Sequence, residues 1–274
     1  FKNSFRYYPS GFLYDATGHS AFWKADADKW AMLSFCNNKI AEQIVAAINP
    51  TMHFHIGYFD SLPWPDKLDT QAAERIASRS IHVSKSDWDA YETSWNFTSL
   101  PLLSSDHRAE TLAASYDILR AHWQGMTDEM QRLEEENNRI FIDAYGLADE
   151  FTPEVPIEEI TLTCNPAYRY GVKGTEEDRE ARLREDTVAE LLHYAVGCMF
   201  GRYSLDAPGL ILANQGEGIE EYLARVPEPT FAPDRDNVIP VLDADWFADD
   251  IVTRARDFLR VTFGEAKFRE NLAF

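Results

Sequence analysis

Residues 112–144 read LAASYDILRAHWQGMTDEMQRLEEENNRIFIDA. Within this stretch a seam of mostly apolar side chains repeats at alternating steps of four and three: Leu112, Tyr116, Leu119, Trp123, Met126, Met130, Leu133, Asn137, Ile140 and Ala144. A repeat with this period predicts one long helix, from about residue 105 to 145, packed along another helix. Two roles stay open for it: a core helix of a bundle, or a rigid spacer between two modules.

Both ends of this helix have candidate caps. Ser104 or Ser105 can accept hydrogen bonds from the first free N–H groups, and Gly146 suits the position after the last turn. Asn137 places a polar side chain on the seam, where it either fixes the register of packing or marks a solvated end. Gly125 weakens the helix interior by about 1 kcal/mol relative to alanine.

The segment before residue 67 predicts a small α/β piece. Apolar side chains at 12–14 indicate a short strand, and the spacing of apolar side chains over 26–48 predicts a helix that Asn49-Pro50 ends. Strict alternation over 52–58 predicts a half-buried strand, with His53 and His55 on its polar side. No nearby cysteine or third histidine completes a metal site with them.

The rest of the chain predicts helices with a few short strands. We expect a helical connector over 67–150 and then a module over 151–274. That module holds a strand at 160–163, a helix from about 176 to 200 and a helix from about 243 to 263. The fold class is therefore α+β and α-rich: a small α/β piece of the specificity type, a long coiled-coil-like helix, and a second helical module with short strands.

Composition limits the class of protein. With 274 residues, 45% of them hydrophobic, the chain can bury a sizeable core without covalent staples. Its three cysteines are odd in number and far apart, which favours a reducing cytoplasm over a disulfide framework. No apolar run approaches the length of a membrane span and no signal peptide is recognisable. Because the chain opens at Phe1, we expect a piece of a longer protein.

Charge is distributed unevenly along the chain. The formal net charge is −20, but residues 1–65 carry five basic and five acidic side chains. Binding to phosphates needs clustered Lys and Arg, so this neutral segment is the better candidate for contact with DNA. Basic and aromatic residues alternate there in a pattern that suits phosphate contacts and base stacking, although ordinary surface decoration is the alternative: Arg6, Tyr7, Tyr8, Lys24 and Lys29.

Two short motifs imitate catalytic sites. Asn165-Pro166-Ala167-Tyr168 resembles the Asn-Pro-Pro-Tyr motif with which amino methyltransferases hold a flipped-out base. Alanine replaces the second proline, and no glycine-rich cofactor loop precedes it, so we interpret Asn165, Pro166 and Tyr168 as a turn after the strand at 160–163. Gly216-Glu217-Gly218 lacks the third glycine of a nucleotide loop, and its acidic surroundings would repel phosphate.

Several long strings resemble one family over nearly the whole chain. They are INPTMHFHIGYFDSLP (48–63), SDWDAYETSWNF (86–97), RLEEENNRIFIDAYGLADE (132–150), NPAYRYG (165–171), VGCMFGRYSLDAPGLILANQG (196–216), DNVIPVLDADWFADDIV (236–252) and FGEAKFRENLAF (263–274). Together they resemble the PglX-type adenine-specific DNA methyltransferases of BREX phage-exclusion systems.

This resemblance implies a parent enzyme that transfers a methyl group from S-adenosylmethionine to N6 of adenine in double-stranded DNA. It also implies other phage-exclusion proteins as partners and a catalytic domain outside this chain, so that no catalytic residue and no bound cofactor are expected here. Residues 1–66 would end a TaqI-like target-recognition region, 67–150 would form the helical connector, and 151–274 an acidic family-specific module. The alternative function is an acidic protein–protein module that docks partner subunits or imitates the charge of DNA.

Overall fold

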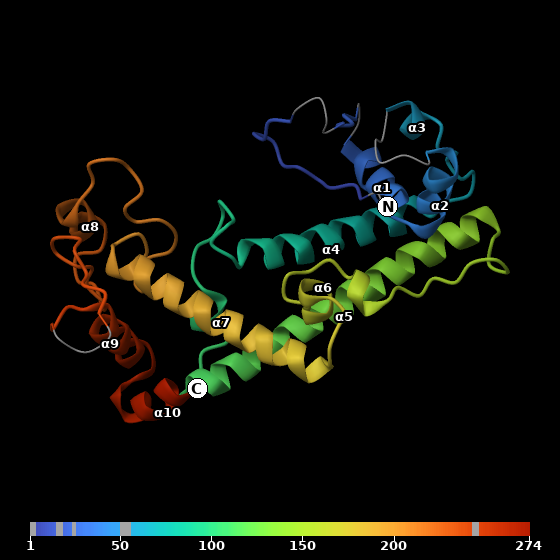
Figure 1. Ribbon diagram of the computed structural model, residues 1–274. Helices are drawn as coiled ribbons and strands as arrows, with labels where there is room; N and C mark the ends of the chain where they lie inside the picture. Colours follow the sequence, from blue (N-terminus) through green and yellow to red (C-terminus); the bar gives the residue numbers. More distant parts are fainter. Residues whose placement is uncertain (1–3, 15–18, 24–25, 50–55, 243–246) are drawn as a thin grey trace. The chain divides into compact units, whose positions relative to one another are not determined.

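The computed structural model describes residues 4–14, 19–23, 26–49, 56–242 and 247–274 (Figure 1). Its elements are α1 (Asp26–Cys36), α2 (Lys39–Ile48), α3 (Ile56–Asp60), α4 (Thr70–Asp89), η1 (Pro101–Leu103), α5 (Leu112–Tyr145), η2 (Ile157–Glu159), α6 (Pro166–Tyr170), α7 (Glu176–Met199), α8 (Ile219–Arg225), α9 (Ile251–Phe263), η3 (Glu265–Lys267) and α10 (Phe268–Ala273). The α-rich prediction is confirmed. The α+β part is not, because the described residues form no strand.

The predicted long helix is confirmed as α5, which has 34 residues and a length of about 50 Å at about 1.5 Å per residue. Its start differs from the prediction, because the Thr111 hydroxyl accepts the hydrogen bond from Ala114 N (3.1 Å). Its end follows the prediction. Gly146 adopts φ +69°, and Leu147 N donates to the carbonyl of Ile142 at 2.9 Å, which closes the last turn.

The buried face of α5 follows the seam at first and then departs from it. The seam side chains from Leu112 to Asn137 are buried, but Ile140 is only half-buried, and its neighbour Phe141 is fully buried. A straight helix lags about 20° behind a seven-residue repeat in each heptad. Four heptads after Leu112 the lag is about 80°, so residue 141 points within about 20° of the starting direction.

Two glycines of α5 should respond in opposite directions to alanine. Gly125 lies inside the helix with open space at its Cβ position, so Gly125→Ala should raise the free energy of unfolding by about 1 kcal/mol. Gly146→Ala should lower it by about 1 kcal/mol, because an L side chain is strained at φ +69°. Urea unfolding measures both. Shifts of the same sign would show that the helix does not end at Tyr145.

The predicted helix at 26–48 is divided into α1 and α2. Asn38 lies between them, and its side-chain oxygen accepts from Ile40 N (2.8 Å) and Ala41 N (3.0 Å), which caps α2. The α5 side chain Asn137 donates to the carbonyl of Ser34 (2.9 Å) and accepts from the Ser34 hydroxyl. Asn137 is therefore a buried polar link to α1 and not a solvated end.

The strand predicted at 160–163 is absent for a physical reason. Ile160 and Leu162 are buried, as alternation requires, but no neighbouring strand in the described chain supplies backbone acceptors. The carboxylate of Asp87 takes that role instead: it accepts from Thr163 N at 2.7 Å and from Cys164 N at 2.9 Å. A buried side chain at the end of α4 thus replaces a sheet.

Two other predicted strands are wrong where the structure describes them. Residues 12–14 form no ladder, and Leu13 is 99% exposed. The strand predicted at 52–58 is replaced from Ile56 onward by the short helix α3, while its earlier part, with His53 and His55, lies outside the described residues. Alternation alone cannot distinguish an extended segment from a strand, since a strand also needs a paired neighbour.

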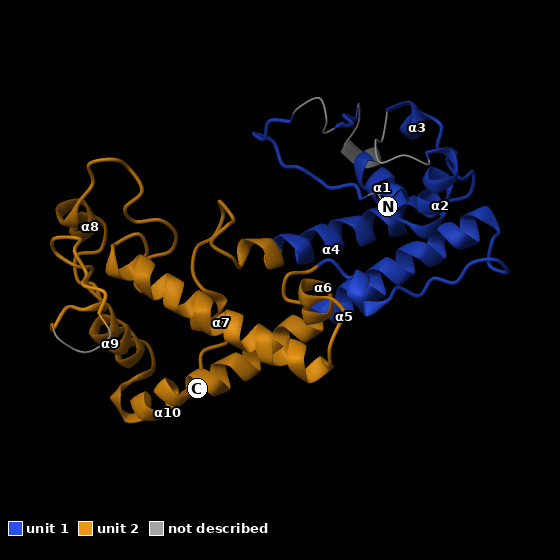
Figure 2. Ribbon diagram, viewed as in Figure 1, with its two compact units in different colours: residues 1–85, 126–161 blue, residues 86–125, 162–274 orange. Residues whose placement is uncertain are grey.

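The chain forms two compact units, each built from two separate stretches (Figure 2). Unit 1 comprises residues 1–85 and 126–161, and unit 2 comprises 86–125 and 162–274. The division into 1–66, 67–150 and 151–274 is a functional one and stays a prediction. All three cysteines are buried and free. Within the described residues, no helix is long and apolar enough to span a membrane.

Aromatic side chains form much of the core in each unit. In unit 1, Phe35 packs on Phe141 with ring centroids 5.7 Å apart. In unit 2, Tyr194 of α7 stacks on Tyr203 at 5.2 Å, and α7 packs against α6 and α9. The predicted helix at 176–200 is confirmed as α7, whereas the one predicted at 243–263 begins only at Ile251, capped by Asp250.

Candidate functional site

Helix α4 presents a row of basic side chains within unit 1. Arg75, Arg79 and His82 follow one another at steps of four and three, so they share one face of the helix, and all three are exposed. The opposite face is apolar and buried; it consists of Ala72, Ala73, Ile76, Ala77 and Val83. Burial of that face fixes the rotation of α4 and thereby turns the basic row outward.

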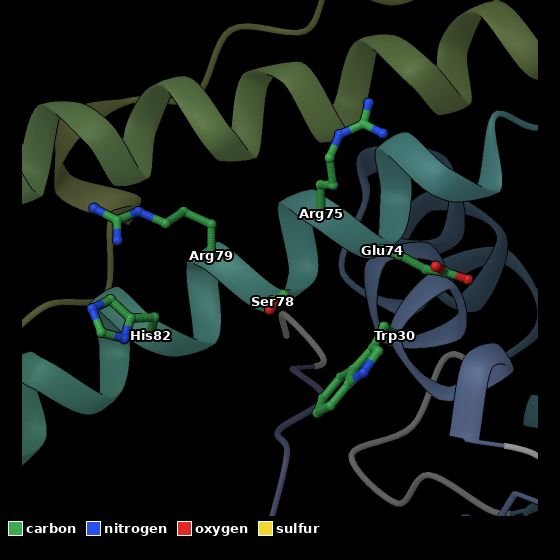
Figure 3. A pocket seen from close by; sticks show the side chains of 6 residues that line it. All are labelled: Trp30, Glu74, Arg75, Ser78, Arg79 and His82. Carbon is green, nitrogen blue, oxygen red and sulfur yellow. The ribbon is translucent and has the colours of Figure 1, made fainter.

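An open groove of about 550 Å³ lies between this row and α1 (Figure 3). Five of its lining side chains come from α4, and the sixth is the half-buried indole of Trp30 from α1: the lining residues are Trp30, Glu74, Arg75, Ser78, Arg79 and His82. The groove thus combines one aromatic wall with basic and hydroxyl groups, which suits an anionic ligand that carries a flat ring.

The two guanidinium groups of the groove differ in charge compensation. Arg79 donates Nε and Nη2 to the two carboxylate oxygens of Glu129, at 2.6 and 2.7 Å. This bidentate pair holds the pKa of Glu129 below its ordinary value, mainly through the hydrogen bond with Arg79. Arg75 has no ion-pair partner among the residues that the structure describes. Arg75 therefore supplies the uncompensated positive charge.

Two of the predicted DNA-contacting residues gather at Trp30. The ring of Tyr7 meets that of Trp30 edge to face at 4.9 Å between centroids, and Lys29 Nζ lies 4.5 Å from the Trp30 centroid. Lys29 also lies 5.9 Å from the Tyr7 ring. This cation–π cluster fixes an ammonium group and two aromatic rings beside the groove.

The other predicted DNA-contacting residues are elsewhere. The exposed Arg6 donates to the carbonyl of Phe5 at 3.3 Å, and Tyr8 packs edge to face on Phe12 at 5.8 Å. Lys24 lies outside the described residues. The sequence analysis missed Trp30 and the α4 row, although basic residues at steps of four and three in 75–82 were a readable signal.

The Asn-Pro-Ala-Tyr motif forms the start of α6. Asn165 is 1% exposed, and its side-chain oxygen accepts from Ala167 N at 3.1 Å, so it caps the helix. Pro166 occupies the first turn and is buried, while Tyr168 is 47% exposed. A methyltransferase motif would need the Asn oxygen for the amino group of the base, but here the backbone already uses it.

The glycine-flanked loop at 216–218 is filled by its own acid. The Glu217 carboxylate accepts from Ala213 N and Asn214 N, both at 3.0 Å, and pairs with Arg225. These hydrogen bonds, that from Arg225 first, lower the pKa of Glu217 to about 2. The N–H groups that could bind a phosphate are therefore occupied by a fixed negative charge, and the loop does not fit a nucleotide-type cofactor.

The chain is similar over its length to a segment of adenine-specific methyltransferases, which confirms the resemblance carried by its motifs. It is 34% identical over 274 residues to the adenine-specific methyltransferase BrxX of Escherichia coli O9:H4 (strain HS), a match that covers 99% of the chain. It is also 34% identical over 276 residues to the adenine-specific methyltransferase PglX of Lacticaseibacillus casei (strain Zhang). No protein-family model matches the chain.

The match covers only part of each relative. The chain spans 22% of the length of BrxX and 21% of the length of PglX. What those proteins do as wholes is therefore a statement about much longer chains.

Proposed function

We propose that this chain is the DNA-specificity and spacer part of a site-specific DNA adenine-N6 methyltransferase in phage defence. The parent enzyme uses S-adenosylmethionine, and this part positions double-stranded DNA without transferring the methyl group. The observation that carries the proposal is the similarity of 99% of the chain to segments of two adenine-specific methyltransferases. Other proteins of the phage-exclusion system are its partners.

The distribution of charge supports a DNA-contacting role for residues 1–85. They carry nine basic and eight acidic side chains in a chain whose net charge is −20. By contrast, residues 126–161 of the same unit carry two basic and eleven acidic side chains. DNA phosphates are attracted to the first surface and repelled by the second, so the basic groove and the Tyr7–Trp30 cluster are the contact face.

The geometry of the two catalytic look-alikes supports a role without chemistry. The Asn165 oxygen is committed to the backbone of α6, and Glu217 occupies the loop that imitates a cofactor site. Neither fits S-adenosylmethionine or a target base, so we assign the methyl-transfer step to other parts of the parent enzyme.

A gel shift with a DNA duplex at increasing salt tests this proposal. We expect binding that weakens steeply between 50 and 200 mM salt, as counterion release requires. Calorimetric titration with S-adenosylmethionine should give no heat of binding. Binding to partner proteins but not to DNA would instead favour the acidic interaction module, and saturable cofactor binding would contradict a non-catalytic role.

Releasing Arg79 from its carboxylate should strengthen DNA binding. Glu129→Gln removes the charge that compensates Arg79, so affinity for a duplex at low salt should rise about two- to fivefold. Fluorescence anisotropy with a labelled duplex measures the change. The matched control is Asp128→Asn, which changes an exposed acid one position away that is not paired with Arg79. An equal gain in both variants would mean that only the net charge matters.

A further inference from the structure

We propose that the groove between Trp30 and α4 binds one unpaired nucleotide of a DNA strand, with its base against the indole and its phosphate at Arg75. This inference rests on the proposed function and names the form of DNA that the contact face takes. Three features of the groove carry it: its shape, its single uncompensated cation, and the aromatic side chains nearby.

The shape suits one nucleotide better than a duplex. The groove is concave, has a volume of about 550 Å³ and has Trp30 as one wall. A base can stack on an indole only when its own flat face is free, and base pairs in a duplex already stack on their neighbours. An aromatic wall inside a small groove therefore favours a base that has left the stack, or a single strand.

The charge of the groove matches a single phosphate. Arg79 is neutralised by Glu129 in the bidentate pair, which leaves Arg75 as the guanidinium without an ion-pair partner among the described residues. A duplex carries one negative charge for about every 1.7 Å of its axis, about twice the linear charge density of one of its strands. A protein with a net charge of −20 and one free guanidinium in its groove repels a duplex more strongly than a single strand.

Further aromatic rings on the same N-terminal segment can extend the stacking surface. Six of them in residues 7–23 are at least 37% exposed: Tyr7, Tyr8, Phe12, Tyr14, Phe22 and Trp23. Exposed rings at this density are unusual for a surface without a ligand. Successive bases of a flexible strand stack on such rings in proteins that bind single-stranded DNA, whereas the bases of a rigid duplex cannot.

The polar groups of the groove fit the remaining atoms of a nucleotide. The Ser78 hydroxyl can donate to a phosphate or base oxygen, and His82 lies one turn beyond Ser78 on the same helix. Glu129 holds Arg79 in place, so its fixed guanidinium can stack without being available as a free charge. The groove thus binds one strand without a requirement for base sequence.

Titration of the 274-residue chain with oligothymidylate of twelve nucleotides tests the inference, with a duplex of the same length as comparison. Tryptophan fluorescence is the readout, since stacking on thymine quenches an indole. We expect tighter binding of the single strand. Trp30→Ala should weaken it about tenfold or more, Trp30→Phe should retain most of it, and Arg75→Ala should lower the salt slope by about 0.7.

Matched controls lie on the other unit. Trp95→Ala removes an indole that is 93% exposed, and Arg269→Ala removes one exposed guanidinium. Unchanged single-strand binding in Trp30→Ala and Arg75→Ala would overturn the inference, as would a preference for duplex. Salt-dependent duplex binding that survives either result would leave the proposed function standing. Binding of neither DNA would overturn both.

Discussion

Replacing Asp87 by alanine is expected to lower the free energy of unfolding by about 2–4 kcal/mol. Asp87 is 6% exposed, and its carboxylate accepts from Thr163 N at 2.7 Å and from Cys164 N at 2.9 Å. Alanine would leave both N–H groups buried without an acceptor, and each such group costs about 1–3 kcal/mol. Urea unfolding followed by circular dichroism measures the loss.

Asp117→Ala is the matched control for this change. Asp117 is exposed on α5, so its removal alters the charge by the same amount and should change stability by less than about 0.5 kcal/mol. Asp87→Asn should fall between the two, because one side-chain oxygen remains as an acceptor. An Asp87→Ala protein as stable as the Asp117→Ala protein would show that another acceptor holds residues 163 and 164.

Replacing Phe141 by alanine should cost about 3–5 kcal/mol in unit 1. Its side chain is 0% exposed and packs on Phe35, which in turn contacts Trp64 with centroids 5.3 Å apart. The cavity left by the ring would lie between α5 and α1, where the surrounding helices can collapse only partly. Chemical unfolding of the purified variant gives the value.

The neighbouring seam position provides the control. Ile140 belongs to the seven-residue repeat but is only half-buried, so Ile140→Ala should cost no more than about 1.5 kcal/mol. A larger loss at Ile140 than at Phe141 would mean that α5 supercoils with its repeat, and that the buried face does not rotate as in a straight helix.

The sequence predicted those elements whose determinants are local. The four-and-three spacing found α5, because a helical period places those side chains on one face whatever they pack against. Gly146 marked its end, since few other residues adopt φ +69°. The strand at 160–163 was wrong because a distant acid, Asp87, satisfies its backbone, and nothing local in the sequence reveals that contact.

The candidate site was predictable only in part for the same reason. Tyr7 and Lys29 were identified by their alternation in the sequence, and the structure brings both to Trp30. Arg75 lies 45 positions after Trp30 and joins it only because α1 and α4 face the same groove. A site formed by two helices depends on how those helices pack, which the spacing within either helix does not specify.

Salt dependence also distinguishes a DNA-contacting face from mere net charge. In the long acidic chain, the positive groups of residues 1–85 gather on one surface while the acids of 126–161 occupy the remainder of the same unit. If the first surface contacts DNA, removing its cations must reduce the number of counterions released on binding. Removing cations from unit 2 must not.

The most direct measurement is therefore the slope of log affinity against log salt for a DNA duplex, compared between two double variants. Lys29→Ala with Arg75→Ala removes two cations from the groove region, and Arg235→Ala with Arg269→Ala removes two exposed cations from unit 2. We predict that the first pair reduces the slope by about 1.8 and the second leaves it unchanged. Equal slopes for both pairs and the wild type would contradict DNA contact through residues 1–85.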